Sequence, residues 1–378
     1  MKYSILPFVA LLLFSCGGNS DQSSAGNYTD ITISMDTVVV DSGDEILMAA
    51  TNPYGHSYSR DARRLYYWDG RSAGLEIVDL DNFQLLAKKT FETEGPNGVG
   101  KDAYQSCLAG EDRMAFSDWN QVVITDFEGN VKDRIKLSDE WITANLDDTS
   151  SLSLLGFSDD WNWMYCEITN FSKLNSNIVK VDWINKTTDL IELPEFDKRE
   201  NFRVTFKSAS NGGTSMSMVS PSLDLEKNRE KVIFWSDAFT NVYTYDAKND
   251  SLKFELIISS LTANEKMGTY KNDVSSYEAM SEEISKINLE VSFSKLLWDD
   301  KNKIYYRFSS YNLPKIADED SKSRVFLSII SENFEMMVEK EVSNLFKTVP
   351  AAQFVKDGLI YCFLNVNDEL GYVRIKAN

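Results

Sequence analysis

The chain has 378 residues, with 39 Lys or Arg against 58 Asp or Glu, which gives a formal net charge of −19 at pH 7. Such an acidic chain lacks the basic footprint of a nucleic-acid-binding protein, and its surface charge would repel anionic lipid headgroups. We therefore expect no nucleic-acid partner. A solvated acidic surface accounts for the charge, with a cationic ligand or bound Ca²⁺ as the alternative.

Residues 1–15 have the features of a targeting segment. Lys2 provides the positive end, and residues 5–14 form an apolar run that is shorter than the ~20 residues of a membrane-spanning helix. The run ends in Leu-Phe-Ser-Cys, with Cys16 last, and this motif resembles a lipobox. We predict a signal peptide over 1–15, a lipid on Cys16 that anchors the protein to the membrane, and a flexible tether over 16–28. An ordinary signal peptide with a chance cysteine is the alternative.

The rest of the chain is rich in short segments that alternate with period two and are separated by polar turn clusters, which is the pattern of β-strands. Several of these segments are similar to one another, which indicates a repeat architecture. The steps between them match a four-stranded blade of ~40–50 residues, with insertions in the longer ones. The similar segments begin at Leu65, Met114, Met164, Val232, Ile304 and Leu359.

The repeat predicts one all-β domain over residues 29–378, a six-bladed β-propeller with four antiparallel strands per blade. The last unit lacks a fourth strand, and the alternating run over 30–40 has no partner. We expect that run to complete the last blade and close the ring, because closure removes exposed sheet edges. The apolar spacing within 276–288, with Ser276 as the cap, predicts a short inserted helix.

Within a unit, the third strand ends in an aspartate, whose carboxylate can accept a backbone N–H two residues on and so begin a turn. We predict this structural role for Asp79, Asp126, Asp182 and Asp246. The fourth unit is the clearest copy, with a turn expected over 226–229. Its predicted strands cover residues 217–223, 231–235, 241–245 and 252–258.

Three features combine into a family resemblance. The turn Glu-Gly-Pro-Asn-Gly-Val-Gly at 94–100 leads into the second blade, and the helical insert leads to 291–293 and then to the tyrosine-rich strand at 305–308. Behind a lipoprotein signal, these features resemble the uncharacterised six-bladed, TolB-like propeller lipoproteins of Bacteroidetes. The resemblance covers nearly the whole mature chain and implies the propeller fold and an outer-membrane anchor, on the periplasmic or the cell-surface side. It implies no activity and supplies no catalytic residues.

The longest connections are expected on one face of the propeller, where loops on a rigid scaffold usually carry binding residues. We predict that this long-loop face binds the ligand. The connections between successive units cover 93–102, 138–151, 194–215 and 259–290, and those between second and third strands cover 169–176, 309–323 and 364–370.

Five residues are candidates for binding a ligand. Asn97 lies in the glycine-rich turn, where a structural role is the alternative to an amide that points into the central opening. Arg307 alternates with Tyr306 along a strand, so the two side chains face opposite ways. Such an arginine either pairs with an acid and covers apolar surface or binds a carboxylate or sugar. Arg60 and Arg203 are similar candidates with less support.

The sequence lacks the signatures of common enzymes. His56 is the only histidine, which excludes multi-histidine metal sites and leaves at most one histidine-dependent triad. There is no Gly-x-Ser-x-Gly elbow and no EF-hand loop, and the 94–100 turn lacks the ending of a phosphate-binding loop. We therefore expect no cofactor and no metal. Adjacent acids such as Asp159 and Asp160 do not establish the pair of carboxyls ~5–10 Å apart that a glycosidase needs.

Apart from Cys16, the cysteines are Cys107, Cys166 and Cys362. An odd number cannot form a complete disulfide framework. Each lies in or beside an apolar strand, so we expect buried free thiols, with one bridge as the alternative in an oxidising compartment.

The sequence thus predicts a non-catalytic lipoprotein whose propeller binds a protein, peptide or glycan at the cell envelope. Its predicted membrane contact is the lipid on Cys16. Two alternatives remain: a carboxylate-dependent hydrolase or lyase that acts on an envelope glycan or peptide, and an accessory subunit of an outer-membrane assembly. Raised carboxyl pKa values in the central opening would favour an enzyme, and an exposed apolar patch on the loop face would favour a protein partner.

Overall fold

The computed structural model describes residues 30–147, 150–170, 173–210, 213–228, 231–314 and 322–377. The predicted signal peptide (1–15), the lipidation site Cys16 and the tether (16–28) lie outside these ranges. Within them, no helix combines the length and the apolar character needed to cross a membrane.

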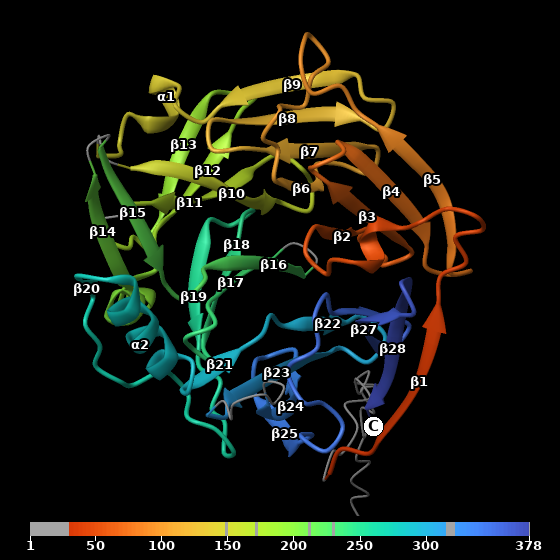
Figure 1. The fold of residues 1–378 in the computed structure, drawn as a ribbon, viewed down its shortest axis with the longest axis vertical. Helices are drawn as coiled ribbons and strands as arrows, with labels where there is room; N and C mark the ends of the chain where they lie inside the picture. The colour runs from red at the N-terminus through yellow and green to blue at the C-terminus, as the bar shows by residue number, and fades with distance from the viewer. Residues whose placement is uncertain are drawn as a thin grey trace, which may run out of the picture.

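The fold is all-β, and its described strands form seven sheets (Figure 1). Six of the seven are meanders, in which strands that follow one another in sequence pair antiparallel; we call them the meander sheets. In chain order they consist of β2 (His56–Tyr58), β3 (Arg64–Asp69), β4 (Gly74–Asp79) and β5 (Gln84–Thr90); β6 (Gln105–Leu108), β7 (Arg113–Ser117), β8 (Gln121–Asp126) and β9 (Val131–Lys136); β10 (Ser151–Phe157), β11 (Met164–Thr169), β12 (Ile178–Asp182) and β13 (Thr187–Ile191); β16 (Asp224–Asn228), β17 (Lys231–Trp235), β18 (Val242–Asp246) and β19 (Ser251–Glu255); β21 (Val291–Phe293), β22 (Leu297–Asp299), β23 (Ile304–Asn312), β24 (Ser323–Ser331) and β25 (Met336–Glu341); and β26 (Phe354–Lys356), β27 (Leu359–Val366) and β28 (Glu369–Ala377) with β1 (Ile33–Val39).

Three junctions between successive meander sheets join their first strands: β2 lies next to β6, β6 next to β10, and β10 next to β16 (Figure 1). In a fourth junction, β22 lies next to β26. Side chains bridge these contacts, since the Ser57 hydroxyl donates to the Ser106 carbonyl at 3.1 Å and the Gln105 amide donates to the Leu154 carbonyl at 2.9 Å. The sheets therefore follow one another in a propeller-like succession.

The N-terminal strand pairs in the last sheet, as the sequence predicted. β1 runs antiparallel to β28, from Ile33 opposite Ala377 to Val39 opposite Gly371. The Lys340 ammonium of β25 donates to the Ile31 carbonyl at 2.6 Å, which also ties the start of the chain to the preceding sheet. The two ends of the described chain are thus held in one sheet.

The predicted aspartate turns are present. In each, one carboxylate oxygen accepts the backbone N–H two residues on, at 2.7 Å for Asp79 and 3.0 Å for Asp126, and the other accepts the side-chain amide of a following asparagine. Asp182 and Asp246 repeat the arrangement. These acids are structural, and their abundance does not mark a catalytic site.

The fourth unit departs from its prediction. Residues 217–223 do not form its first strand, and 226–229 is not the turn, because β16 covers both Leu225, which packs into the core, and Asn228. The alternating run that suggested the earlier strand belongs instead to β15 (Gly213–Val219). β15 pairs with β14 (Val204–Ser210), which pairs in parallel with β20 (Asp273–Val274), so a seventh, three-stranded sheet lies outside the meander series.

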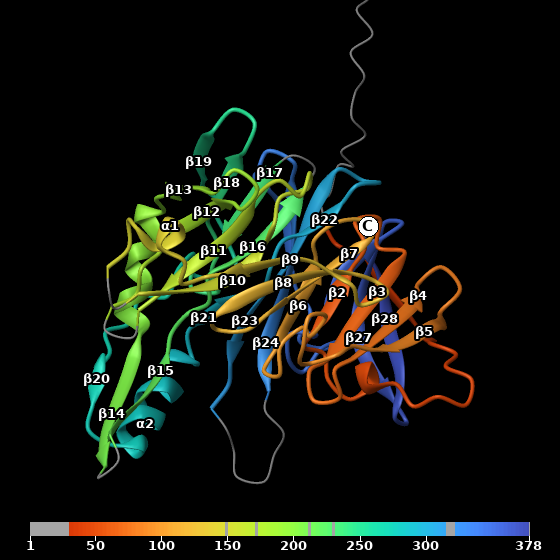
Figure 2. The same ribbon diagram turned by 90° about the horizontal axis from the view of Figure 1, so that it is seen from above.

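The predicted helix is confirmed as α2 (Tyr277–Ile287), with the Ser276 hydroxyl accepting from the Ala279 N–H at 3.2 Å. Its buried Met280 and Ile287 pack against the seventh sheet and the fourth meander sheet. Figure 2 shows β14, β15, β20 and α2 together at one end of the molecule. The other described helical segments are η1 (Met48–Ala50), α1 (Glu140–Thr143) and η2 (Pro194–Phe202).

All three cysteines in the described residues are free thiols, as predicted. Cys166 and Cys362 are buried, whereas Cys107 is only half-buried. Burial raises the pKa of Cys107 to about 12, which keeps this thiol protonated and unreactive at neutral pH.

Candidate functional site

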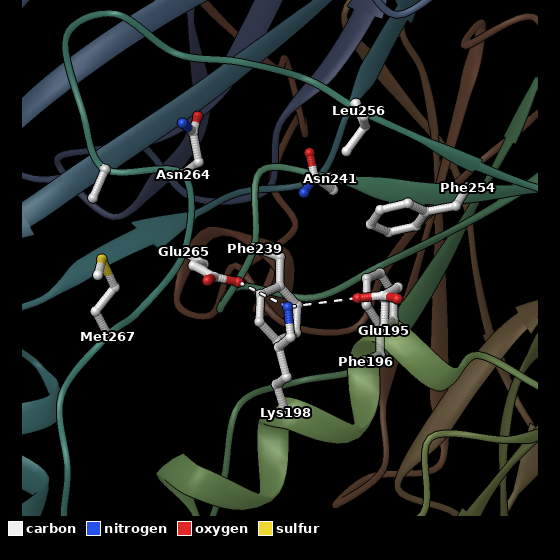
Figure 3. A pocket seen from close by; sticks show the side chains of 11 residues that line it. Glu195, Phe196, Lys198, Phe239, Asn241, Phe254, Leu256, Asn264, Glu265 and Met267 are labelled. Atoms are coloured by element: carbon white, nitrogen blue, oxygen red, sulfur yellow. Dashed lines mark ion pairs between the residues drawn. The ribbon is translucent and has the colours of Figure 1, made fainter.

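A cavity of about 530 Å³ opens where three connections meet at one end of the fourth meander sheet (Figure 3). The helical segment η2 forms one wall, the turn between β17 and β18 forms the floor, and the connection after β19 forms the opposite wall. Two of these three segments, 194–215 and 259–290, are among the long loops that the sequence analysis placed on the ligand face. The lining residues are Glu195, Phe196, Lys198, Phe239, Asn241, Phe254, Leu256, Ala263, Asn264, Glu265 and Met267.

Aromatic rings form the floor. Phe196 stacks on Phe239 with ring centroids 5.3 Å apart and meets Tyr243 edge to face, and Tyr243 makes a tilted contact with Phe254. The Tyr243 hydroxyl accepts the Glu195 N–H at 3.0 Å, which fixes the start of η2 over the sheet. The floor is therefore rigid, because buried rings from three segments hold one another in place.

Two asparagines brace the opposite wall. The side-chain oxygen of Asn241 accepts the Ile257 N–H at 2.9 Å, and that of Asn264 accepts the Ser259 N–H at 2.7 Å. The backbone N–H of Thr240 donates to the Asn264 carbonyl at 2.8 Å. Each carboxamide oxygen is thus fixed by a backbone donor, which leaves the NH₂ group as the donor available to a ligand.

Three charges cross the mouth of the cavity (Figure 3). The Lys198 ammonium lies 3.5 Å from the Glu195 carboxylate on its own helical segment and 3.6 Å from the Glu265 carboxylate on the facing wall. All three side chains are about half exposed. The group has one positive and two negative charges, so its net charge is −1.

The rim is unusually apolar. Leu256 is 65% exposed, Ile258 is 68% exposed and Met267 is 76% exposed, all on the connection between β19 and α2. Leu261, on the same connection, is also exposed. Single exposed apolar residues are common, but several on one loop beside a cavity are typical of an interaction surface.

Two of the five predicted site residues lie on β23 and are buried. The Arg307 guanidinium is 2% exposed and donates to the backbone carbonyls of Ser294, Phe239 and Thr240, the first at 2.7 Å. Burial lowers the pKa of Arg307 to about 9. Since Phe239 lines the cavity, Arg307 supports the floor from behind. The Tyr306 hydroxyl is buried against Asp299.

The other three lie elsewhere. Arg203 is buried, bonds to the Glu200 carboxylate at 3.0 Å and contacts Thr205, so it ties the end of η2 to β14. Arg60 lies in the turn between β2 and β3 and pairs with Asp159 at 3.3 Å. Asn97 is exposed in its turn. None of the five predicted residues lines the cavity.

Sequence reasoning missed Glu195, Lys198, Phe239, Leu256 and Glu265. One signal was available, the five large apolar side chains within 256–267, a stretch that is otherwise polar. The predicted fourth strand over 252–258 includes the first three of them, which concealed the loop. No local sequence pattern indicates that η2 lies opposite this loop.

A second group of charges lies at the first strands of the meander sheets. The pKa of Asp224 is raised to about 7, mainly because surrounding strands enclose the carboxyl and also because Glu226 carries a like charge nearby. The side chain nevertheless reaches solvent. Neighbouring acids are matched by cations: Glu226 lies 3.2 Å from Lys295, and Asp159 lies between Arg60 and Lys227. Among the residues described, no group of three or more His, Cys, Asp or Glu side chains could hold a metal ion.

The architecture and the loop-lined cavity define an all-β protein of propeller-like sheets. The family model described as "Domain of unknown function (DUF4221)" matches residues 28–341, and the chain belongs to this family. This agrees with the expectation of a family without an assigned activity. None of the curated proteins matches the chain.

Two solved structures from Bacteroides support the fold. A member of the DUF4221 family from Bacteroides vulgatus is 12% identical, with a TM-score of 0.65, over 92% of this chain and 98% of that one. A Bacteroides fragilis protein, provisionally named an exported protein, is 9% identical, with a TM-score of 0.52, over 96% of this chain and 98% of that one. The β-propeller domain of Cps50 (Swd1) from Myceliophteria thermophila is 11% identical, with a TM-score of 0.42, over 84% and 82%.

Proposed function

We propose that the protein is a non-catalytic binding protein of the bacterial cell envelope and that the cavity between η2 and the 256–267 loop receives a segment of a partner protein or peptide. The observation that carries this proposal is a cavity with a fixed aromatic floor whose lining includes the exposed Leu256 and Met267. Apolar pockets of 300–1,000 Å³ with a few oriented polar groups are typical ligand sites.

A peptide fits this site better than a glycan does. Sugar rings stack on flat, exposed aromatic faces, whereas Phe196 and Phe239 are buried against each other. The exposed apolar side chains here, Leu256 and Met267, are aliphatic or thioether groups, which favour protein partners. The asparagine NH₂ groups would then bind backbone carbonyls of the segment.

The proposal includes the finer architecture. The six meander sheets form the blades of a closed six-bladed propeller, in which β1 completes the last blade, and the three-stranded sheet with α2 is an insertion. The pairing of β1 with β28 and the contacts between successive first strands support this arrangement.

The test is a comparison of cross-linking positions in cells. A photo-reactive amino acid at position 267 should cross-link to an envelope protein, whereas the same group at position 184 should not. Ile184 is a matched control, because it is 69% exposed but lies in the turn between β12 and β13. Equal products at both positions, or none at 267, would contradict the proposal.

We also propose that Cys16 carries a lipid that anchors the protein in the outer membrane, on the periplasmic or the cell-surface side. The lipobox-like motif supports this location, as does the name of the Bacteroides fragilis protein. Replacement of Cys16 by Ala should abolish labelling with a fatty-acid analogue and release the protein from the membrane fraction. Persistent labelling of the variant would refute the assignment.

A carboxylate-dependent hydrolase is the second candidate, and one observation favours it: the raised pKa of Asp224, to about 7, beside Glu226. A group that titrates near neutral pH suits general acid or base catalysis. If this reading holds, envelope glycan fragments incubated with the protein yield products, and Asp224→Asn removes that turnover. Turnover that persists in Asp224→Asn would exclude Asp224 as the catalytic group.

A further inference from the structure

We propose that the segment bound in the cavity carries an arginine or lysine beside a large apolar side chain, and that Lys198 occupies the place of that cation until the partner displaces it. This inference rests on the proposed function and adds the chemistry of the ligand.

The position of Lys198 indicates a replaceable cation. Its ammonium lies 3.5 and 3.6 Å from the two carboxylates, longer than the ~2.7–2.9 Å of a strong charge-assisted hydrogen bond. The side chain is half exposed, and ion pairs of this kind are weak. Lys198 can therefore swing into water at little cost and leave the two carboxylates facing the cavity.

The carboxylates are set for a cation that bridges the two walls. Glu195 lies on η2, whose start is fixed by the bond from the Glu195 N–H to the Tyr243 hydroxyl. Glu265 lies between Asn264 and Lys266, whose backbones pair with Thr240 and Ala238 at 2.8 and 3.0 Å. A guanidinium offers five donors in a planar fork and can bind both carboxylates, which a single ammonium does less well.

The rest of the cavity suits the apolar part of such a segment. Phe254, Leu256 and Met267 line the space beside the charges. The methylene stem of an arginine and a neighbouring leucine or phenylalanine would cover these surfaces while the charged head reaches the carboxylates. The chain as a whole, with a net charge of −19, attracts a basic segment at long range.

The experiment is a selection of displayed random peptides on the full mature protein in a neutral detergent. Peptides that contain arginine or lysine next to a large apolar residue should be enriched. Enriched peptides are then synthesised with glutamine in place of the basic residue, which should weaken binding at least about tenfold. Added salt should weaken the basic peptides more than the glutamine versions.

Three variants separate the roles of the charges. Lys198→Met should tighten binding of the basic peptides about threefold to fivefold, because the internal competitor is gone. Glu195→Gln with Glu265→Gln should weaken them by about tenfold. Lys253→Met is the matched control: it also removes one positive charge, from an exposed lysine that pairs with Glu255 on β19 at 2.7 Å, and should leave affinity within about twofold.

The outcomes distinguish the two proposals. Enriched peptides that bind the cavity but are acidic or uncharged would overturn this inference and leave the binding function standing. Weaker binding of the basic peptides by Lys198→Met would also overturn this inference and leave the binding function standing, because Lys198 would then contact the ligand itself. The absence of any enriched peptide, together with no cross-link at position 267, would overturn both.

Discussion

The meander sheets and the connections that surround the cavity are held by different kinds of contact. In the meanders, a carboxylate such as that of Asp182 bonds to groups two and three residues away. Around the cavity, the acceptors are distant in sequence: Glu339 of β25 accepts from the Ser259 hydroxyl and the Ser260 N–H, both at 2.6 Å, and Glu290 accepts the Gly268 N–H at 2.9 Å. Hydrogen bonds within local turns therefore stabilise the regular sheets, whereas acceptors that are distant in sequence fix the positions of the loops around the cavity.

The largest effect is expected from replacement of Arg307, which lies on β23 of a meander sheet and also bonds to the floor of the cavity. Arg307→Met would leave the carbonyls of Ser294, Phe239 and Thr240 buried without a donor. We expect a loss of at least about 3 kcal/mol in the free energy of unfolding, measured by urea denaturation. The free energy of unfolding of Arg307→Lys should lie between those of the wild type and Arg307→Met, because a lysine keeps the charge but cannot reach all three acceptors.

A matched control is available on the next strand. Arg324 is exposed and makes a two-fold ion pair with Glu341, at 3.1 and 2.8 Å. Arg324→Met should cost much less stability than Arg307→Met, because solvent screens an exposed ion pair. Equal losses for the two arginines would mean that burial does not decide the contribution.

The second prediction tests whether Glu339 alone fixes the loop. Glu339→Ala should destabilise the 256–267 loop by about 2 kcal/mol, since the buried Ser259 hydroxyl and the exposed Ser260 N–H lose a charged acceptor. The amides of Ser260 and Leu261 should then exchange hydrogen faster, while the amides of β17 and β18 keep their protection. Glu335→Ala, in the turn of the same hairpin, is the control and should change neither. Uniform loss of protection would show that the loop is part of the cooperative core.

The same contrast explains what the sequence could predict. The Ser276 cap, the Asp turns and the β1 strand all follow from neighbouring residues or from period-two alternation, and all are present. The alternation that predicted a meander strand over 217–223 does not show that residues 217–219 pair with β14. The meeting of Lys198 with Glu265 depends on how η2 packs over Phe239, which no local pattern encodes. For that reason two of the predicted arginines, Arg307 and Arg203, hold segments that surround the cavity but do not line it.

The third prediction concerns pH and the first strand of the first meander sheet. His56 is enclosed by Tyr67 and Phe363, and this burial lowers its pKa from 6.5 to about 4. Between these values the unfolded chain binds more protons than the folded one, so stability rises with pH in this window and is lost as pH falls from about 6.5 toward 4. We expect about 1–2 kcal/mol less stability at pH 5 than at pH 7 from this group.

His56→Gln should remove that part of the pH dependence, seen as a flatter plot of unfolding free energy against pH. Because His56 is the only histidine, its ring signals in a proton NMR spectrum are unambiguous. They should titrate near pH 4. A midpoint near 6.5 would show that the ring is solvated and that the first sheet opens readily there.

The smallest effect tests whether the meander turns are equivalent. Asp182→Ala removes the acceptor of the Asn185 N–H and side-chain amide, at 2.9 and 2.8 Å, in an exposed turn. We expect a loss of about 1 kcal/mol for Asp182→Ala at pH 7, and Asp246→Ala should destabilise the protein through the same loss of turn contacts. The backbone donor at Asn185 lowers the pKa of Asp182, so its contribution is present above the acid range and fades as pH falls below about 4. Losses that differ between the two turns by more than about 1 kcal/mol would show that packing around each sheet, and not the shared turn chemistry, sets the stability of the meanders.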